Sequence, residues 1–387
     1  MKGKIILSLD TKVELLFLSE EDLIEAGALN MEHCVEVIDE MFRILGEGDY
    51  LLGGPAENDH GVRIWFPKEK RSKNMPVAGP DRRFMALASY LGGSYNIAGE
   101  KWYGSNVENS KKGLPRSILT ISLNDVETGQ PISYMSGNLI SAMRTGAVPG
   151  VATKYLASDQ AKTVAIIGAG VISWSSIRAI LLSRKELKKV NVFDIQKERA
   201  EDFCDKLMKE FNVEAVAYDS MDNALNNADL INIATSGPVQ PEVKEEQLKD
   251  GAVLMISGGA KISDDLLLNN RIVFDNWEMH RSTADDWVKW EYLQSNIEGI
   301  RKDLFYGIGG QTYRLIKENK LNESDLTNLG DIVTQKKIGR SNDKEKIIFF
   351  AGGMATEDIA WAYTLYKAAC DKNIGQKLKL WDKPHWS

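Results

Sequence analysis

The chain of 387 residues contains few cysteines, and they lie far apart. Cys34, Cys204 and Cys370 form neither a CxxC metal motif nor an even-numbered disulfide framework, so we expect a reducing, cytoplasmic compartment. Histidine is also scarce, no two histidines have metal-ligand spacing, and the HExxH pattern is absent. We therefore predict no metal site.

Long apolar runs and basic blocks are missing as well. No run approaches the ~18 residues that a membrane-spanning helix needs, so we expect no membrane partner. A net charge of −7 without a long basic block argues against nucleic acid as a partner. The N-terminus has only a short apolar run, interrupted by Asp10, and does not predict a signal peptide. At this length we expect two domains.

The segment 164–194 has the order strand, glycine turn, helix, strand and acid. Residues 164–167 form a short apolar run, as expected of a strand buried in a parallel sheet. Gly168, Ala169 and Gly170 follow, and then an amphipathic stretch. The first glycine permits a tight turn, and the second lets the backbone approach a pyrophosphate at the helix N-terminus. This context predicts a dinucleotide site.

We predict that the dinucleotide is NAD. The carboxylate of Asp194, which ends the second strand, would accept hydrogen bonds from the adenosine ribose and repel a 2′-phosphate. Lys197 and Arg199 lie close enough to leave the choice between NAD and NADP open. The other predicted cofactor contacts are Val171, Ile172, Ile195, Thr145, Ala234, Thr235 and Ser236.

Before this segment, the pattern predicts an antiparallel sheet. Runs of strand-forming residues at 84–90, 97–103 and 117–123 are joined by glycine-containing turns, and another run follows at 132–135. A helix is expected over 138–157, which leads into the dinucleotide segment. In that helix Asn138 would be the N-cap, and Pro149 would introduce a kink that divides the helix.

After Asp194, helical segments alternate with apolar runs, as in a doubly wound sheet. Further strands are expected at 229–235, 252–257, 271–275 and 347–350. Residues 276–330, with Trp277, Trp287 and Trp290, are expected to be helical and to cover the sheet edge or the cleft. A C-terminal helix over 356–369 is followed by an expected poorly ordered tail at 380–387.

Three residues outside the glycine motif carry charges that could be functional. His60 lies in a stretch rich in glycine, proline and charge, which favours a solvated loop histidine. Lys101 lies within a predicted strand, where a lysine can simply face solvent. Arg144 lies among small and apolar residues, where a cation needs either a structural acid or a ligand.

Six blocks in order along nearly the whole chain resemble the ornithine cyclodeaminase/mu-crystallin family. They are GEKWYGS at 99–105, NDVETGQP at 124–131, SAMRTGAV at 141–148, VAIIGAGV at 164–171, IGR at 338–340 and GGMATEDIAWAY at 352–363. Residues 81–93 and the ending NIGQKLKLW resemble two branches of the family. One contains opine-type amino-acid dehydrogenases that make siderophore precursors, and the other is a bacterial group associated by name with tyramine oxidase.

The resemblance implies an α/β fold with two domains. Residues 1–140, completed by 335–387, would form an α+β substrate and dimerisation domain with an antiparallel sheet. Residues 141–334 would form a Rossmann-type, doubly wound parallel sheet that binds NAD. The implied assembly is a homodimer, and the implied chemistry is NAD(P)-linked oxidation of an amino acid to an imine, or the reverse.

The resemblance also implies site residues. Lys101 matches the family's active-site lysine, and Arg144 matches its carboxylate-binding arginine. Both would be catalytic and contact an amino-acid-like substrate, with further substrate contacts from Arg82, Gly353 and Met354. A second family arginine, expected near Gly53, has no clear match, and Arg63, Arg82 or Arg83 could replace it.

One position departs from the cyclodeaminases. They carry an aspartate directly after the paired glycines, but Ala260 follows Gly258 and Gly259 here, and Asp264 and Asp265 come later. Three functions therefore remain open. The first is an NAD(H)-dependent oxidoreductase acting on the C–N bond of an amino or imino acid. The second is ornithine cyclodeaminase proper, converting L-ornithine to L-proline and ammonia. The third is a nucleotide-binding accessory protein of an amine (tyramine) oxidase system with low turnover.

Overall fold

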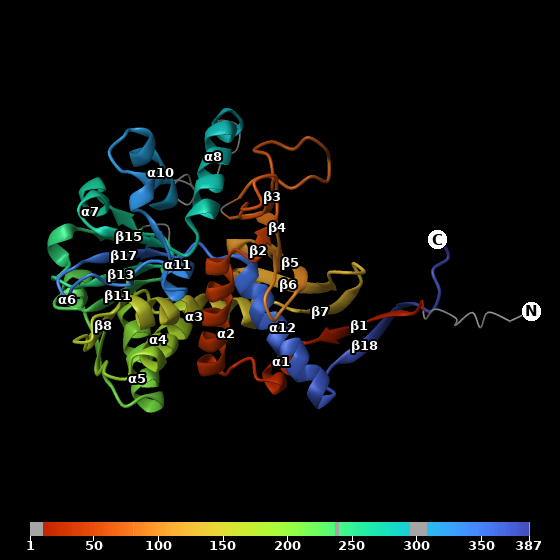
Figure 1. The fold of residues 1–387 in the computed structure, drawn as a ribbon, viewed down its shortest axis with the longest axis horizontal. Helices are drawn as coiled ribbons and strands as arrows, with labels where there is room; N and C mark the ends of the chain where they lie inside the picture. Colours follow the sequence, from red (N-terminus) through yellow and green to blue (C-terminus); the bar gives the residue numbers. More distant parts are fainter. Residues whose placement is uncertain (1–10, 80, 237–239, 295–307, 387) are drawn as a thin grey trace, which may run out of the picture.

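The computed structural model describes residues 11–79, 81–236, 240–294 and 308–386. Two eight-stranded sheets and the helices packed on them make up this part of the chain (Figure 1). Within it, no helix combines the length and apolar character that crossing a bilayer requires. The α/β architecture predicted from the sequence, with one antiparallel and one parallel sheet, is confirmed.

The first sheet is mainly antiparallel, in the order β18-β1-β7-β6-β5-β4-β2, with β3 paired to β4. Its strands are β1 (Val13–Leu18), β2 (Tyr50–Leu52), β3 (Val62–Trp65), β4 (Arg83–Leu91), β5 (Ile97–Ser105), β6 (Ser117–Asp125), β7 (Pro131–Ser136) and β18 (Gln376–Trp381). Side chains alternate between its faces, so that Met85 and Leu87 are buried while Phe84 is exposed. The buried face is covered by α12 (Ala355–Lys372), with α1 (Glu20–Ala26) against β1 and β7, and α2 (Met31–Glu47) packs on α12 (Figure 1).

The second sheet is parallel throughout, in the order β10-β9-β8-β11-β13-β17-β15-β16. Its strands are β8 (Thr163–Ile167), β9 (Lys189–Phe193), β10 (Glu214–Ala217), β11 (Leu230–Ile233), β13 (Val253–Ile256), β15 (Arg271–Phe274), β16 (Thr327–Asn328) and β17 (Ile347–Phe350). The central strands β11, β13 and β17 are buried along their whole length, and all their residues are apolar except Asn232. The chain moves outward from β8 to β10 and then returns to β11 on the other side of β8, which creates a topological switch point there.

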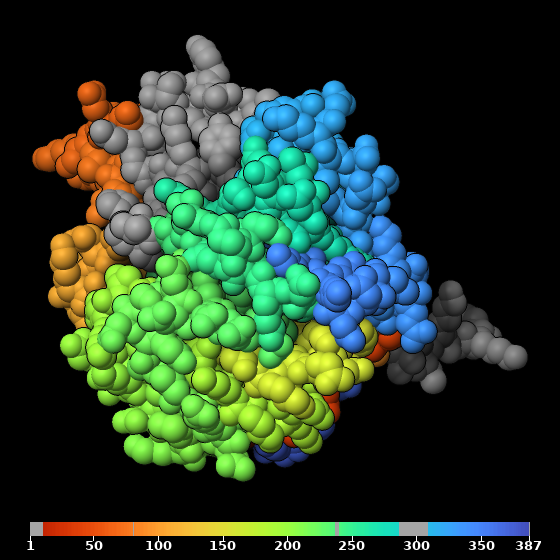
Figure 2. Space-filling view, turned by 90° about the vertical axis from the view of Figure 1, so that its left-hand side faces the viewer, coloured from red at the N-terminus to blue at the C-terminus, as the bar shows by residue number. Residues whose placement is uncertain are grey.

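The remaining elements surround the parallel sheet or join it to the first. The helices are α3 (Asn138–Leu156), α4 (Val171–Ser183), α5 (Lys197–Glu210), α6 (Met221–Leu225), α7 (Asp264–Leu268), α8 (Trp277–Gln294), α10 (Ile308–Lys317) and α11 (Leu329–Val333). Short strands β12 (Glu242–Val243) and β14 (Lys261–Ile262) form a separate pair. Figure 2 shows the parallel-sheet domain in green between N-terminal residues in orange and C-terminal residues in blue.

Strand β17 links the two predicted domains. It comes from the segment 335–387, which the sequence assigned to the substrate domain, but it pairs with β13 and β15 inside the parallel sheet. The helix α12 that follows it returns to the first sheet. The parallel sheet therefore includes residues that lie beyond the proposed domain boundary between residues 334 and 335.

The predicted division of helix 138–157 into two pieces is wrong, because α3 is one continuous helix that contains Pro149. Both halves of the helix pack closely on α4: Gly146 lies against Ser175, and Gly150 lies against Ala179. Asn138 is not the N-cap either, since Gly137 occupies that position. The Asn138 amide instead accepts from the Leu119 N–H at 2.9 Å and donates to the Ser117 carbonyl at 2.8 Å, which pins α3 to β6.

The prediction of a poorly ordered tail from Leu380 is also wrong at its start. Leu380 and Trp381 belong to β18, which pairs antiparallel with β1 and forms a ribbon that projects from the body (Figure 1). The unpaired edge of β1 explains this, because a free strand edge recruits any extended segment nearby. The Trp381 indole adds a bond to the Thr11 carbonyl at 3.0 Å.

Residues 276–330 are mainly helical where they are described, as expected. Trp277 packs on Phe274, with ring centroids 5.0 Å apart, and its indole donates to Glu323 at 2.6 Å. This tryptophan is therefore a packing residue. The side chains of Trp287 and Trp290 lie outside the described part of the chain.

Candidate active site

Lys101 on β5 and Arg144 on α3 meet at the start of α12. The Lys101 ammonium lies 2.6 Å from one carboxylate oxygen of Asp358, and the Arg144 Nε donates to the other at 3.0 Å. Arg144 also forms an ion pair with Glu357. Lys101 is only 3% exposed and Arg144 only 6%, while both acids are fully buried. The alternative of a solvent-facing Lys101 is therefore excluded, and Arg144 has the acid partners that its apolar surroundings require.

Strand alternation explains why Lys101 is buried. It pairs across the sheet with Leu87 and Ile121 on the face that α12 covers, whereas the next residue, Trp102, points to the opposite face. The two acids lie in the first turn of α12, where the helix dipole favours negative charge. The first sheet, α3 and α12 together thus hold a buried cluster of two cations and two carboxylates.

Burial also changes the acid–base properties of this cluster. It lowers the pKa of the Lys101 ammonium to about 8, an effect that nearby Arg144 strengthens and Asp358 opposes. Burial raises the pKa of the Glu357 carboxyl to about 7, and here Arg144 opposes the shift. Two of the four groups can therefore exchange protons near neutral pH.

The glycine pair before α12 brings this cluster to the edge of the parallel sheet. Gly352 and Gly353 follow β17 almost directly, and a Cβ on Gly353 would lie 2.7 Å from an Arg144 nitrogen. Gly353 also has a φ of +79°, which a side chain would strain. Met354 is fully buried at the N-cap position of α12. Of the predicted substrate contacts, Gly353 therefore lies against Arg144, whereas Met354 is part of the core.

Asp275 and His280 belong to the same neighbourhood, although the sequence motifs did not indicate them as site residues. One carboxylate oxygen of Asp275 accepts from the N–H groups of Gly352 and Gly353 at 2.6 and 3.0 Å. The other lies 2.8 Å from His280 Nε2. Asp275 directly follows β15, and acids at the carboxyl ends of parallel strands are frequent site residues. That rule would have identified Asp275 from the sequence.

His60 is not the solvated loop histidine that the sequence favoured. Its Nδ1 lies 2.8 Å from a guanidinium nitrogen of Arg63, and burial holds its pKa well below the usual range. The positive groups that add to this shift are Arg63, Lys101, His280 and Arg144. Since a guanidinium can only donate, Nδ1 accepts, and the proton of the neutral ring is on Nε2. His60 therefore presents a hydrogen-bond donor close to the buried cations.

The candidate replacements for the second arginine differ in position. Arg63 lies beside His60 and, like Lys101 and Arg144, adds to the positive potential at the His60 ring. Arg82, which the sequence predicted to bind substrate, instead donates to the Val77 carbonyl at 3.1 Å within its own loop. Arg83 is paired with Asp81 and lies over the rings of two aromatic residues. Of these three arginines, Arg63 is thus the one that contacts a residue near the buried cluster, His60.

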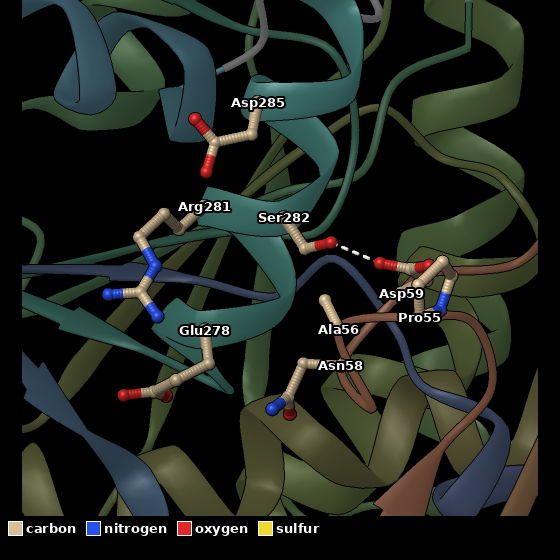
Figure 3. Close-up of a pocket in the computed structure, with 8 residues that line it drawn as sticks. All are labelled: Pro55, Ala56, Asn58, Asp59, Glu278, Arg281, Ser282 and Asp285. Atoms are coloured by element: carbon tan, nitrogen blue, oxygen red, sulfur yellow. Dashed lines mark hydrogen bonds between the residues drawn. The ribbon is translucent and has the colours of Figure 1, made fainter.

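A cavity lies where the loop that carries His60 meets α8 (Figure 3). It has a volume of about 170 Å³ and is lined by Pro55, Ala56, Asn58, Asp59, Glu278, Arg281, Ser282 and Asp285. Ser282 donates to Asp59 across it, as the dashed line in the figure shows. Nearby, Asn276 donates to the Tyr50 hydroxyl at 2.9 Å. These two contacts join the first sheet to the parallel-sheet domain beside the buried cluster.

The glycine turn after β8 has the geometry that a dinucleotide requires. Gly168 has a φ of +93°, and a Cβ there would lie 3.1 Å from the Thr235 side chain. A Cβ at Gly170 would meet nothing within 4 Å. Val171, at the start of α4, is 71% exposed, although apolar side chains are usually covered. The turn is therefore tight on its inner side and open at the helix N-terminus, where a pyrophosphate would bind.

The other predicted cofactor residues come from the elements next to this turn and from α3. Ala234, Thr235 and exposed Ser236 follow β11, next to β8, and the Thr235 hydroxyl donates to the Gly259 carbonyl at 2.7 Å. Ile195 is 85% exposed after β9. Thr145 lies on α3 beside Arg144, and its hydroxyl donates to the Ser141 carbonyl at 2.6 Å.

Asp194 has a structural task in addition to its predicted one. One of its carboxylate oxygens accepts from the Ala169 N–H at 2.8 Å, and the other accepts from the Gln196 N–H at 2.9 Å. The acid therefore braces the glycine turn from the end of β9. Each carboxylate oxygen can accept more than one hydrogen bond, so capacity for ribose hydroxyls remains.

A family model matches residues 28–373 and describes the ornithine cyclodeaminase/mu-crystallin family. The chain belongs to this family. Among its members, the N-((2S)-2-amino-2-carboxyethyl)-L-glutamate dehydrogenase of Staphylococcus aureus is 28% identical over 95% of this chain and 99% of that protein. A Delta(1)-pyrroline-2-carboxylate reductase of Bacillus cereus is 29% identical over 70% of this chain and 77% of that protein.

Solved structures agree with the family assignment. The Delta(1)-pyrroline-2-carboxylate reductase of Thermococcus litoralis, in complex with NADH and L-proline, superposes with a TM-score of 0.72. It is 27% identical, and the match covers 94% of this chain and 99% of that one. An archaeal alanine dehydrogenase dimer with bound NAD has a TM-score of 0.73 at 23% identity, over 95% of this chain and all of that one, and supports the fold alone.

Within the ornithine cyclodeaminase/mu-crystallin family, the resemblance to the cyclodeaminases leads us to expect an aspartate after the paired glycines, where this chain has Ala260. Ala260 is nearly buried in an apolar cluster of the parallel-sheet domain. Asp264, the nearest acid along the chain, accepts from Arg314 at 2.6 and 2.8 Å and from Gln311 at 2.8 Å. These bonds engage Asp264 in a surface ion pair, so it is not free to replace the missing aspartate.

Proposed function

We propose that the protein is an NAD(H)-dependent oxidoreductase that acts on the C–N bond of an amino or imino acid. The observation that carries the proposal is the position of Gly352 and Gly353. They leave the carboxyl end of β17, and Gly353 lies against Arg144, so the buried cations lie at the same edge of the parallel sheet as the glycine turn after β8. The relatives, which include amino-acid dehydrogenases and imino-acid reductases, support this chemistry.

In this proposal Arg144 and Lys101 bind the substrate carboxylate, and Gly353 leaves the approach to Arg144 free of a side chain. NAD(H) held by the open helix N-terminus at Gly170 would supply the hydride acceptor or donor. Lys101, with its lowered pKa, also holds a proton that can be exchanged near the reacting nitrogen. The chain's own contribution is orientation and charge at a buried site.

Asp194 supports NAD rather than NADP as the cofactor. Its carboxylate is fixed at the end of β9 by two backbone N–H groups and would repel a 2′-phosphate. The relative from Thermococcus litoralis was solved with NADH, in line with this preference. The engaged Asp264 and apolar Ala260 argue against cyclisation of ornithine, and no observation favours an accessory role in an amine oxidase system.

We further propose a homodimer formed through the outer face of the first sheet. That face, opposite Lys101, exposes a group of large apolar side chains: Val62, Ile64, Phe84, Trp102, Ile118 and Tyr134. Phe84 and Trp102 stack on one another with ring centroids 5.7 Å apart. A contiguous apolar face of this kind marks an interaction surface, and the alanine dehydrogenase of similar fold is a dimer.

A substrate screen tests the proposed function. Purified protein is assayed by absorbance for NAD⁺ reduction with amino acids, including ornithine, and for NADH oxidation with 2-oxo acids plus amine donors. Turnover with an amino or imino acid supports the proposal and names the substrate. Proline and ammonia from ornithine would instead establish a cyclodeaminase despite Ala260. Tight NADH binding without turnover across the panel would overturn the proposal and favour an accessory role.

A further inference from the structure

Glu357 is the buried carboxyl group of the site that the proposed chemistry does not use. It lies in the first turn of α12 and is fully buried. One carboxylate oxygen is paired with Arg144, and the other, Oε1, has no hydrogen-bond partner among the described residues. An ionised carboxylate with an unsatisfied buried oxygen is costly, whereas protonation removes its charge.

Both cations of the cluster already have carboxylate partners before a substrate enters. The cations Lys101 on β5 and Arg144 on α3 face the carboxylates of Glu357 and Asp358. Two other titratable groups are packed against Glu357. Asp275, which follows β15, accepts hydrogen bonds from the N–H groups of Gly352 and Gly353 and contacts His280. Cys34 on α2 has a neutral thiol, because burial raises its pKa. A substrate carboxylate on Arg144 therefore adds one uncompensated negative charge to a buried site.

We infer that Glu357 is a positioning residue that takes up one proton from solvent when the substrate carboxylate binds to Arg144. In this step the Glu357 carboxylate becomes a neutral carboxylic acid, and no other covalent bond is made or broken. The Arg144 guanidinium then pairs with the substrate carboxylate in place of Glu357. The inference rests on the proposed function, because it assumes that Arg144 binds a carboxylate. When no substrate is bound, the Glu357 carboxylate pairs with Arg144 in the place of the substrate carboxylate.

The direction of the pH dependence follows from the raised pKa of Glu357. Below pH 7 the group is largely protonated before binding, so little proton uptake accompanies the ligand. Above pH 7 the proton must be taken up on binding, and the affinity for a carboxylate falls by up to about tenfold per pH unit. Lys101 adds a second loss of affinity above pH 8, where it loses its own charge. The interval between 7 and 8 therefore reports mainly on Glu357.

Calorimetric titration at pH 7.5 in buffers of different ionisation enthalpy counts the protons taken up per ligand. The probe is the tightest binder among pyruvate, oxaloacetate and 2-oxoglutarate, which carry no amine, added to the NADH complex without an amine donor. We expect uptake of roughly 0.5–0.8 proton per probe by the native protein. Glu357→Gln should lose most of this uptake and bind equally well at pH 7 and 8, and Glu357→Asp should keep it. Glu40→Gln, which removes a surface partner of Arg43, is the matched control and should behave like the native protein.

The outcomes separate this inference from the proposed function. If no 2-oxo acid binds, Arg144 does not bind a carboxylate, and both the proposed function and the role of Glu357 are overturned. If the probe binds without proton uptake, or Glu357→Gln retains the uptake, only the role of Glu357 is overturned. Infrared difference spectra of the native protein provide a test that does not depend on a folded variant. The C=O stretch of a protonated carboxylic acid must appear on probe binding, and its absence would contradict the inference.

Discussion

Among single residues, Lys101 shows most clearly how burial turns a common side chain into a functional one. Its pKa is lowered to about 8 by burial, so its charge is lost as pH rises through that value. We predict that the KM for a carboxylate substrate rises more steeply above about pH 8, where Lys101 loses its charge. Replacing Lys101 with alanine should reduce turnover at least about 100-fold, because a cation preorganised in a buried site is lost. Steady-state kinetics across pH measure both effects.

The control for this prediction is Lys154→Ala, which removes an exposed lysine paired with Asp39 on the same molecule. It should leave KM and turnover unchanged. Fluorescence titration should show native NADH affinity for Lys101→Ala as well. Loss of NADH binding in that variant would mean that Lys101 supports the structure or the cofactor and not the substrate.

Asp194 carries a prediction about cofactor choice. Asp194→Asn keeps a side chain that can accept from the Ala169 N–H but removes the charge that faces the ribose. We expect NADH to bind about tenfold more weakly, as loss of a charged hydrogen bond implies, and NADPH to bind more tightly than before. Titrations of both cofactors measure this, with Asp205→Asn on the exposed face of α5 as control. Unchanged affinities for both cofactors would remove Asp194 from the ribose site.

The sequence predicted the cations of the site better than their partners. Lys101 and Arg144 lie in recognisable motifs, and the glycine turn follows from the context of Gly168. The contacts of Arg144 with Glu357 and Asp358 join positions more than 200 residues apart, and local patterns do not indicate such pairs. The sequence favoured a solvated His60 because three of the groups around it, Lys101, His280 and Arg144, are distant in the chain.

At the scale of elements, the packing of α3 on α4 positions Arg144. A Cβ at Gly150 would lie 2.7 Å from the Ala179 Cβ, so Gly150→Ala should push the helices apart and cost about 1–3 kcal/mol of stability. Gly170→Ala is the matched glycine substitution, because a Cβ there meets open space. Thermal unfolding should show a lower midpoint for Gly150→Ala and a native one for Gly170→Ala.

The same pair of variants tests the cofactor turn. Gly170→Ala should weaken NADH binding, since its Cβ would occupy the space that the pyrophosphate needs. Gly150→Ala should bind NADH with native affinity at temperatures where it is folded. If Gly170→Ala bound NADH normally, the dinucleotide would not approach the turn at this residue.

Element types were predictable where periodicity is strong, and terminal details were not. The strands of both sheets follow from alternating or continuous apolar runs. Pro149 was expected to break its helix, but contacts of Gly146 and Gly150 with α4 outweigh the loss of one backbone hydrogen bond. The strand β18 depends on a partner at the other end of the chain, so its own residues gave little indication of it.

At the scale of the whole molecule, the outer face of the first sheet carries the proposed dimer interface. We predict that the native protein has twice its chain mass of 43.2 kDa in solution. Trp102→Glu should convert it to a monomer, because the substitution places a charge at the centre of the apolar face. Met208→Glu on exposed α5 is the control and should remain a dimer. Light scattering that gave the same mass for both variants would contradict this interface.

The central claim is that a hydride passes between NAD(H) and the α-carbon of a substrate held by Lys101 and Arg144. The most direct measurement uses NADH deuterated at nicotinamide C4, in each of its two epimers, with the most active 2-oxo acid and amine or imino acid from the screen. We predict that one epimer delivers one deuterium to the α-carbon of the amino-acid product, as read by mass spectrometry. A product without deuterium from either epimer would contradict the account.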